Sequence, residues 1–112
     1  MKLWIDDVRP APIGEGYIWH KSVNEAKSTI MNWEQGKIAD KDVMWEEFGS
    51  EIELIDVDHD AGDYASDGGD YIKLLDWLEE TGRSYPIHIH SMNPVGVKNM
   101  RRIIRRNGWV EV

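Results

Sequence analysis

Three short polar segments of this sequence could do chemistry together: Asp6-Asp7, Asp58-His59-Asp60 and Ser91-Met92-Asn93. Each follows a short, mainly apolar run. Carboxylates that meet at one point repel one another unless a cation or a proton lies among them. Oxygen-only ligands suit Mg²⁺ or Ca²⁺ better than softer metals. We therefore expect Mg²⁺ to bind at Asp6, Asp7 and Asp58; the alternative is that these are ordinary solvated loop acids.

A candidate anion site lies at the start of the last predicted helix, where Asn93 precedes Pro94. Asn is a favoured N-cap residue. Pro is favoured at the first helical position because the backbone N–H that it lacks would have no partner within the helix. The free N–H groups and the positive end of the helix dipole favour an anion there. We expect a phosphate or phosphoryl group to contact Ser91, Asn93 and the amides of Val95 and Gly96. A cation held by acids beside an anion held by amides is an arrangement that binds phosphoryl groups.

His88 and His90 alternate along a predicted strand and therefore point to one face of the sheet. With Trp4, that face would form a groove for a nucleotide-like ligand, provided that no helix covers it. Two other interpretations stay open. The two histidines and His59, with nearby acids, could bind Zn²⁺, or the histidines are simply hydrogen-bonded on a partly open face.

The last predicted helix has a basic side and an apolar side. The basic side carries five residues, namely Lys98, Arg101, Arg102, Arg105 and Arg106. Cations near a helix C-terminus are favoured by the helix dipole. This side is either a solvated face or a docking surface for an acidic partner.

Strands and helices are predicted to alternate along the chain. The predicted strands cover residues 2–6, 17–20, 52–57, 86–90 and 109–112, with a further short strand at 43–45. The predicted helices cover residues 23–34, after a capping box formed by Ser22 and Glu25, then 70–80 and 94–106. Asp63, Asp67 and Asp70 are expected to serve turns and helix caps. This order predicts an α/β fold with an open, mainly parallel, flavodoxin-like sheet, whose ligand site lies beyond the carboxyl ends of the strands.

Four segments, in order along the chain, carry a resemblance to a known family: KLWIDD at 2–7, LIDVD at 54–58, Gly68/Gly69 with YIKLL at 71–75, and PIHIHS at 86–91. They resemble the receiver domain of two-component response regulators. The resemblance implies that Asp6 and Asp7 are the metal-binding pair, with Mg²⁺ as cofactor. It also implies that Asp58 is the phosphoacceptor and that Ser91 contacts the phosphoryl group. The Asp58–Asp60 run and residues 88–94 are also similar to small receiver-like proteins of mobile elements and conflict systems.

Two departures from the receiver pattern change what we expect. Between Asp7 and Tyr17 there is room for a proline-rich loop but not for the family's first helix, and no last helix follows residues 109–112. Glu111 stands near the place of the family's lysine, which normally neutralises the phosphoryl group. We therefore predict a truncated receiver-like fold that keeps the metal-binding acids, in which phosphorylation of Asp58 is weak or absent.

Composition narrows the class of protein and its partners. A length of 112 residues predicts one domain, residues 1–112. The absence of Cys excludes disulfides and thiolate metal sites, and no apolar run resembles a signal peptide or membrane span, so we expect a cytoplasmic protein. The net charge of −8 argues against nonspecific nucleic-acid binding.

Two function classes stay open, with a third as a weaker alternative. The first is a receiver-like regulatory or interaction module with a protein partner. The second is a protein that binds, sequesters or cleaves a phosphate-bearing small molecule, such as a nucleotide signal. The third is an acidic inhibitor protein encoded by a mobile element. No motif of a conventional hydrolase is present, so the sequence leaves open whether the protein is an enzyme.

Overall fold

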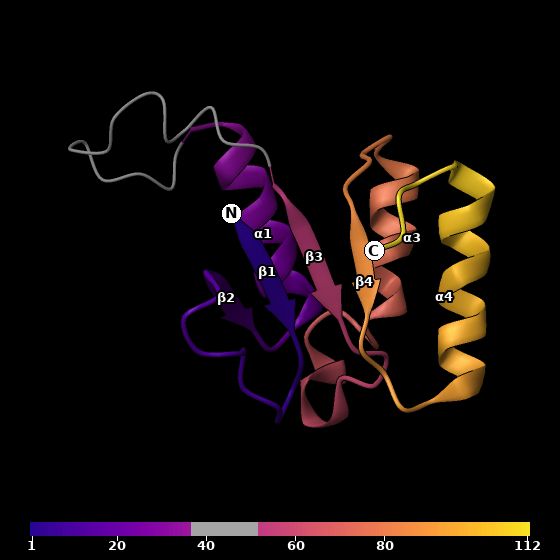
Figure 1. Ribbon diagram of the computed structural model, residues 1–112, viewed down its shortest axis with the longest axis horizontal. Helices are drawn as coiled ribbons and strands as arrows, with labels where there is room; N and C mark the ends of the chain where they lie inside the picture. Colours follow the sequence, from indigo (N-terminus) through magenta and orange to yellow (C-terminus); the bar gives the residue numbers. More distant parts are fainter. Residues whose placement is uncertain (37–51) are drawn as a thin grey trace.

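The computed structural model describes residues 1–36 and 52–112, and the strand predicted at 43–45 lies outside them. Strands and helices alternate as predicted (Figure 1). The elements are β1 (Lys2–Ile5), β2 (Tyr17–His20), α1 (Val23–Glu34), β3 (Leu54–Val57), the 3₁₀ helix η1 (Gly62–Ser66), α3 (Ile72–Glu80), β4 (Ile87–Ile89) and α4 (Pro94–Asn107).

The four strands form one sheet in the order β2-β1-β3-β4, and every pairing is parallel. The predicted final strand at 109–112 is reduced to a single parallel bridge between Ile87 and Glu111. Two backbone hydrogen bonds flank it, from the Ile87 amide to Val110 (2.9 Å) and from the Val112 amide to Ile87 (2.8 Å). The end of the chain therefore lies beside β4 in the place of a fifth strand, although it is too short to form one.

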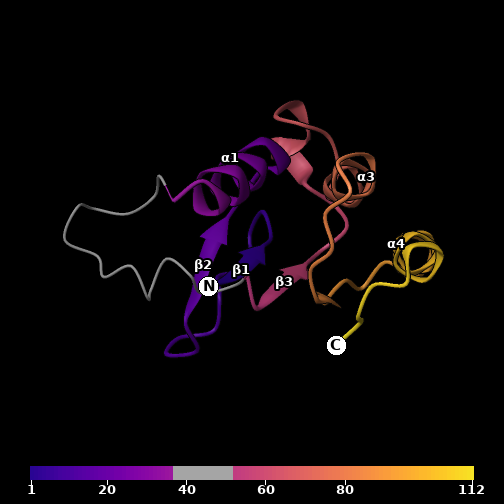
Figure 2. The same cartoon turned by 90° about the horizontal axis from the view of Figure 1, so that it is seen from above.

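One face of the sheet carries the hydrophobic core. Leu3, Ile5, Ile55, Val57 and Ile87 alternate along their strands and are fully buried. The apolar sides of the helices pack against this face and against each other, with Val23 and Ile30 from α1, Leu74 and Leu78 from α3, and Met100 and Ile104 from α4. Viewed from above, α1 and α3 lie over one side of the sheet, and α4 lies beyond the β4 edge (Figure 2).

The opposite face carries aromatic and polar residues. The strand register places Trp4 beside Asp56, and Asp56 beside His88. No described helix lies between β1 and β2, so this face has no helical cover of the kind that α1 and α3 give the other face. The fold is a truncated receiver-like α/β fold, as predicted.

Local capping interactions fix the helix ends. Ser22 caps α1 by accepting a hydrogen bond from the Glu25 amide at 3.0 Å, which confirms the predicted N-cap. Asn93 caps α4 in the same way, accepting from the Gly96 amide at 3.0 Å. The second predicted helix begins later than expected, at Ile72 instead of Asp70. The Asp70 carboxylate accepts from the Ala61 amide at 3.1 Å and so closes the η1 loop instead of capping α3.

The described helices include none with the length and apolar character that crossing a membrane requires.

Candidate functional site

Three carboxylates gather where β1 and β3 end. Asp6 and Asp7 follow β1 and Asp58 follows β3, and one ligand oxygen from each lies within 4.8 Å of the others. The strand pairing continues one step past the strands, because the Asp58 amide donates to the Ile5 carbonyl at 2.9 Å. Gly62 adopts a positive φ of 54° and leaves space for the Asp7 carboxylate, which a Cβ at this position would strike. The predicted metal triad is therefore brought together by the strand register and one glycine.

The two neighbouring aspartates differ in their electrostatic surroundings. Burial would raise the pKa of Asp6, but amide hydrogen bonds from Arg9 and Val8 and a hydrogen bond from His90 lower it overall. Asp6 is fully buried and ionised. The pKa of Asp7 is raised by burial and by the charges of Asp6 and Asp58. A bound cation would therefore relieve the repulsion between the Asp7 carboxylate and those of Asp6 and Asp58.

His90 lies between two buried carboxylates. Its Nδ1 is 2.6 Å from Asp56 and its Nε2 is 2.9 Å from Asp6. Burial would lower the pKa of His90, but the hydrogen bonds and charges of Asp56 and Asp6 raise it overall. Since a carboxylate only accepts, both ring nitrogens donate and His90 is an imidazolium. This buried cation compensates two acids that would otherwise repel each other.

Aromatic rings hold His90 in place. The Trp4 ring stacks on His90 with the ring centroids 3.9 Å apart, and Tyr17 meets Trp4 edge-on at 5.5 Å. The Tyr17 hydroxyl donates to the second oxygen of Asp56 at 3.0 Å. Burial, together with Asp56, raises the pKa of Tyr17 to about 12, so it remains a neutral donor. The face that was expected to be an open groove is therefore filled around Trp4, which is only 8% exposed.

His59 forms a second histidine–carboxylate pair, next in sequence to Asp58. Its Nδ1 lies 2.8 Å from Asp60, while no described residue contacts its Nε2 through a hydrogen bond. The His59 ring packs against Gly96 in the first turn of α4, where a Cβ would strike the ring. Gly96 is thus needed for His59, whereas the sequence analysis expected its amide to contact an anion.

The start of α4 offers fewer free donors than predicted. Asn93 accepts from the Gly96 amide, and the Val97 amide donates to the Asn93 carbonyl at 2.9 Å. Among the described contacts, only the Val95 amide of the first turn has no acceptor. The Ser91 hydroxyl accepts from the Asn93 amide at 3.1 Å and keeps its own proton available. Anion binding here stays a prediction, resting on Ser91 and Val95 and no longer on Gly96.

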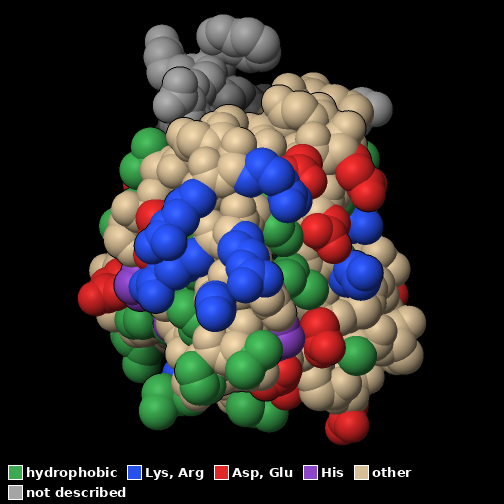
Figure 3. Space-filling view, turned by 90° about the vertical axis from the view of Figure 1, so that its right-hand side faces the viewer, with side chains coloured by type: hydrophobic (Ala, Val, Ile, Leu, Met, Phe, Trp, Pro, Cys, Tyr) green, Lys and Arg blue, Asp and Glu red, His purple; other side chains and the backbone are tan. Residues whose placement is uncertain are grey.

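The basic residues of α4 gather on one surface of the molecule (Figure 3). Two of the five have acidic partners: Arg101 pairs with Glu111 at 2.9 Å and Arg106 with Glu79 at 2.8 Å. The other three, Lys98, Arg102 and Arg105, form no ion pair with any residue of the described ranges. Because the Glu111 side chain is held by Arg101, it does not face the carboxylates of Asp6, Asp7 and Asp58.

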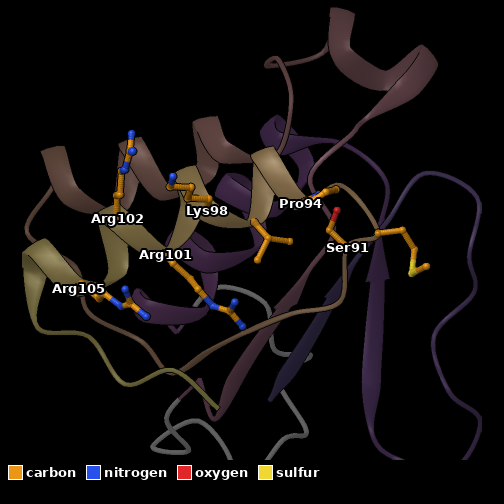
Figure 4. A pocket seen from close by; sticks show the side chains of 8 residues that line it. Ser91, Pro94, Lys98, Arg101, Arg102 and Arg105 are labelled. Carbon is orange, nitrogen blue, oxygen red and sulfur yellow. The ribbon is translucent and has the colours of Figure 1, made fainter.

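A groove of about 570 Å³ follows the basic side of α4. Figure 4 shows Ser91 and Pro94 at one end of the groove and Arg105 at the other. We call it the basic groove; its lining residues are Ser91, Met92, Pro94, Val97, Lys98, Arg101, Arg102 and Arg105.

The structure brings some of the predicted site residues together and separates others. Asp6, Asp7, Asp58, His90 and Trp4 meet at the carboxyl edge of the sheet. His88 is apart from them, since its Nδ1 bonds the Val112 carbonyl at 2.6 Å. Within the described ranges, the carboxylate triad is the one group with metal-ligand spacing, so a Zn²⁺ site of three histidines finds no support.

Sequence reasoning missed two residues of the site and underrated a third. Asp56 and Tyr17 were not assigned, although a charged residue inside the apolar strand LIDV was a usable signal. His59 was considered only as a Zn²⁺ ligand. Its pairing with the adjacent Asp60 could have been proposed from the sequence.

Comparison with known proteins gives one family. The model of the cyclic-phosphate processing receiver domain matches residues 1–106. No curated protein and no solved structure matches the chain.

Proposed function

Because this chain belongs to the family of cyclic-phosphate processing receiver domains, we propose that it opens a cyclic phosphodiester to a phosphomonoester. The observation that carries the proposal is the placement of the Asp6-Asp7-Asp58 triad at the sheet edge, with the His59–Asp60 pair following directly in the chain. It combines a site for a cation with a side chain that can transfer a proton.

The triad suits a hard divalent cation. Its donors are carboxylate oxygens, and Mg²⁺ is commonly held by one or two carboxylates together with substrate phosphate. The raised pKa of Asp7 marks a place where positive charge would stabilise the ionised form. When bound, Mg²⁺ would draw electron density from a phosphoryl oxygen and so favour attack at phosphorus.

We assign the proton transfer to His59. Asp60 accepts from Nδ1 and fixes the ring, so Nε2 carries the exchangeable proton. In the proposed step, the oxygen of a water molecule bonds to phosphorus and one ring P–O bond breaks. The departing oxygen takes the proton of His59, and the proton lost by the water restores His59. The net reaction consumes one water and yields a linear phosphomonoester.

His90 has a different role in this proposal. Both of its nitrogens are occupied by carboxylates, so it has no proton to offer a substrate. It holds Asp6 in one orientation and keeps the charges of Asp6 and Asp56 compensated. His90 is therefore a positioning residue.

Turnover of cyclic phosphates tests the proposal. Purified protein with millimolar Mg²⁺ or Mn²⁺ is incubated with five- and six-membered cyclic nucleotides, and ring opening is followed by ³¹P NMR. We expect EDTA to abolish opening, and His59→Gln to slow it about 100-fold or more, as loss of a general acid does. His88→Gln removes a histidine from the next strand without touching the triad and is expected to leave the rate unchanged. No opening of any cyclic phosphate with either metal would refute the proposal.

Phosphotransfer to Asp58 stays a prediction of weak or absent reaction. Of the two cations of α4 that could stand in for the family's lysine, Arg101 is already bound to Glu111, which supports this expectation, and Lys98 lines the basic groove. Acetyl phosphate with Mg²⁺, followed by intact-mass spectrometry, is expected to give no stoichiometric adduct. A stable adduct on Asp58 would favour signalling by phosphorylation instead.

A further inference from the structure

The basic groove concentrates positive charge on a chain whose net charge is −8. Of its four cations, only Arg101 has an acidic partner among the residues that the structure describes, and that partner is Glu111. Lys98 and Arg105 are seven residues apart on α4, which corresponds to about 10 Å along a helix axis. Uncompensated cations spread over this length favour an anion with more than one charged group.

One end of the groove, at Ser91, lies just past the carboxyl end of β4, at the sheet edge where the carboxylate triad gathers. Its end at Ser91 is one residue from His90, whose ring contacts Asp6. Met92, Pro94 and Val97 add apolar side chains to its lining. Its volume of about 570 Å³ lies within the usual range of small-molecule sites. A groove that starts at the same sheet edge as the triad and is lined by cations fits a ligand that reaches from one to the other.

We propose that the basic groove binds a second anionic group of the substrate, carried at some distance from the cyclic phosphate. This inference rests on the proposed function and narrows its substrate class to molecules with at least two phosphate groups. Lys98, Arg102 and Arg105 hold the second phosphate, and Met92, Pro94 and Val97 contact the part between the two phosphates.

A pair of substrates that differ by one phosphate tests this proposal. They are a nucleoside 2′,3′-cyclic phosphate with a free 5′-hydroxyl and the same compound with a 5′-phosphate. We expect a kcat/KM about tenfold higher for the phosphorylated compound, through KM, as charge-assisted hydrogen bonds to one phosphate would give. In the double variant Arg102→Gln/Arg105→Gln, this preference is expected to fall to near one, through a higher KM for the phosphorylated compound.

Arg106→Gln is the matched control. It removes one arginine charge from the same helix, against two in the double variant, but Arg106 pairs with Glu79 and does not line the groove. The preference should survive in this variant. Equal kcat/KM for both compounds in the wild-type protein, or a preference that the double variant keeps, would overturn the proposal while leaving ring opening intact.

Failure of the proposed function is detected separately. If no cyclic phosphate of either ring size is opened, ring opening is refuted, and binding in the groove is tested by an NMR titration with inorganic pyrophosphate in EDTA. Shifts of the residue 97–105 amides that vanish in the double variant support anion binding there. Absence of such shifts overturns it, and groove-dependent binding of an acidic peptide without binding of pyrophosphate would identify a protein-docking surface instead.

Discussion

Two histidines lie at the carboxyl ends of the two outer strands, and their surroundings differ. His20 ends β2 and bonds neutral groups, with Nδ1 3.0 Å from the Ile18 carbonyl and Nε2 2.8 Å from the Thr29 hydroxyl. Burial lowers its pKa, so His20 is neutral. His90 follows β4 and lies between two carboxylates, which raise its pKa against the effect of burial. Burial alone therefore does not set the charge of a histidine here; the neighbouring acids do.

This difference separates the core of the protein from its candidate site. Near His20, the hydrogen bonds to the Ile18 carbonyl and the Thr29 hydroxyl join neutral groups, so no counter-charge is needed. Near His90 the sheet edge gathers Asp6 and Asp56, and a cation must accompany them. The site is thus the part of the sheet edge where folding has to compensate negative charge.

Replacing His90 should have the largest effect. His90→Gln leaves Asp6 and Asp56 buried without a cation, and we expect it to lower the free energy of unfolding by about 3 kcal/mol. Urea denaturation at neutral pH in EDTA measures this. His88→Gln is the matched control, because His88 is on the same strand and faces the exposed Val112 carbonyl. If the two variants are equally stable, His90 does not compensate the acids.

Much of this arrangement could be predicted from the sequence. The apolar runs before Asp6 and Asp58 indicated which residues end parallel strands, and that rule predicted that the three carboxylates meet; the contribution of Gly62 was not predicted. The Ser22 and Asn93 caps were readable because capping is local. The His90 network was not, since it joins residues 34 and 84 positions apart through the strand register. The contact of His59 with Gly96 depends on how the loop after β3 meets α4, which no local pattern specifies.

A smaller effect is expected from cation binding at the triad. Asp6 is already compensated by His90, but Asp7 is not, so Asp7 should respond more strongly to metal. A ligand at ten times its Kd stabilises the folded state by about 1.4 kcal/mol. We expect millimolar Mg²⁺ or Mn²⁺ to raise the Tm of the wild-type protein relative to EDTA.

Asp7→Asn should remove this metal response while making the metal-free protein slightly more stable, because one repelling charge is gone. Asp63→Asn, in the nearby η1 helix but outside the triad, should keep the full response. Identical Tm values of the wild-type protein with metal and with EDTA would show that the acids do not form a cation site.

The smallest effect we expect is a pH dependence that tests the comparison directly. The pKa of His20 is lowered from its ordinary value of 6.5 by burial, against a weaker opposing effect of Glu25. As the pH falls through 6.5, the unfolded chain binds a proton at this residue before the folded protein does. Stability must then decrease with falling pH, because protonation favours the state that binds the proton more tightly. His20→Gln should remove this part of the decrease, measured as the difference in unfolding free energy between roughly pH 7.5 and pH 5.5 in EDTA.

The contribution of His90 to the pH dependence has the opposite sign: its stabilisation is present below pH 6.5 and is lost as the pH rises through its raised pKa. His90→Gln should therefore keep the decrease on the acid side and flatten the profile on the alkaline side. Profiles that change in the same direction in both variants would mean that the two histidines share one protonation state, and the distinction between core and site would fail.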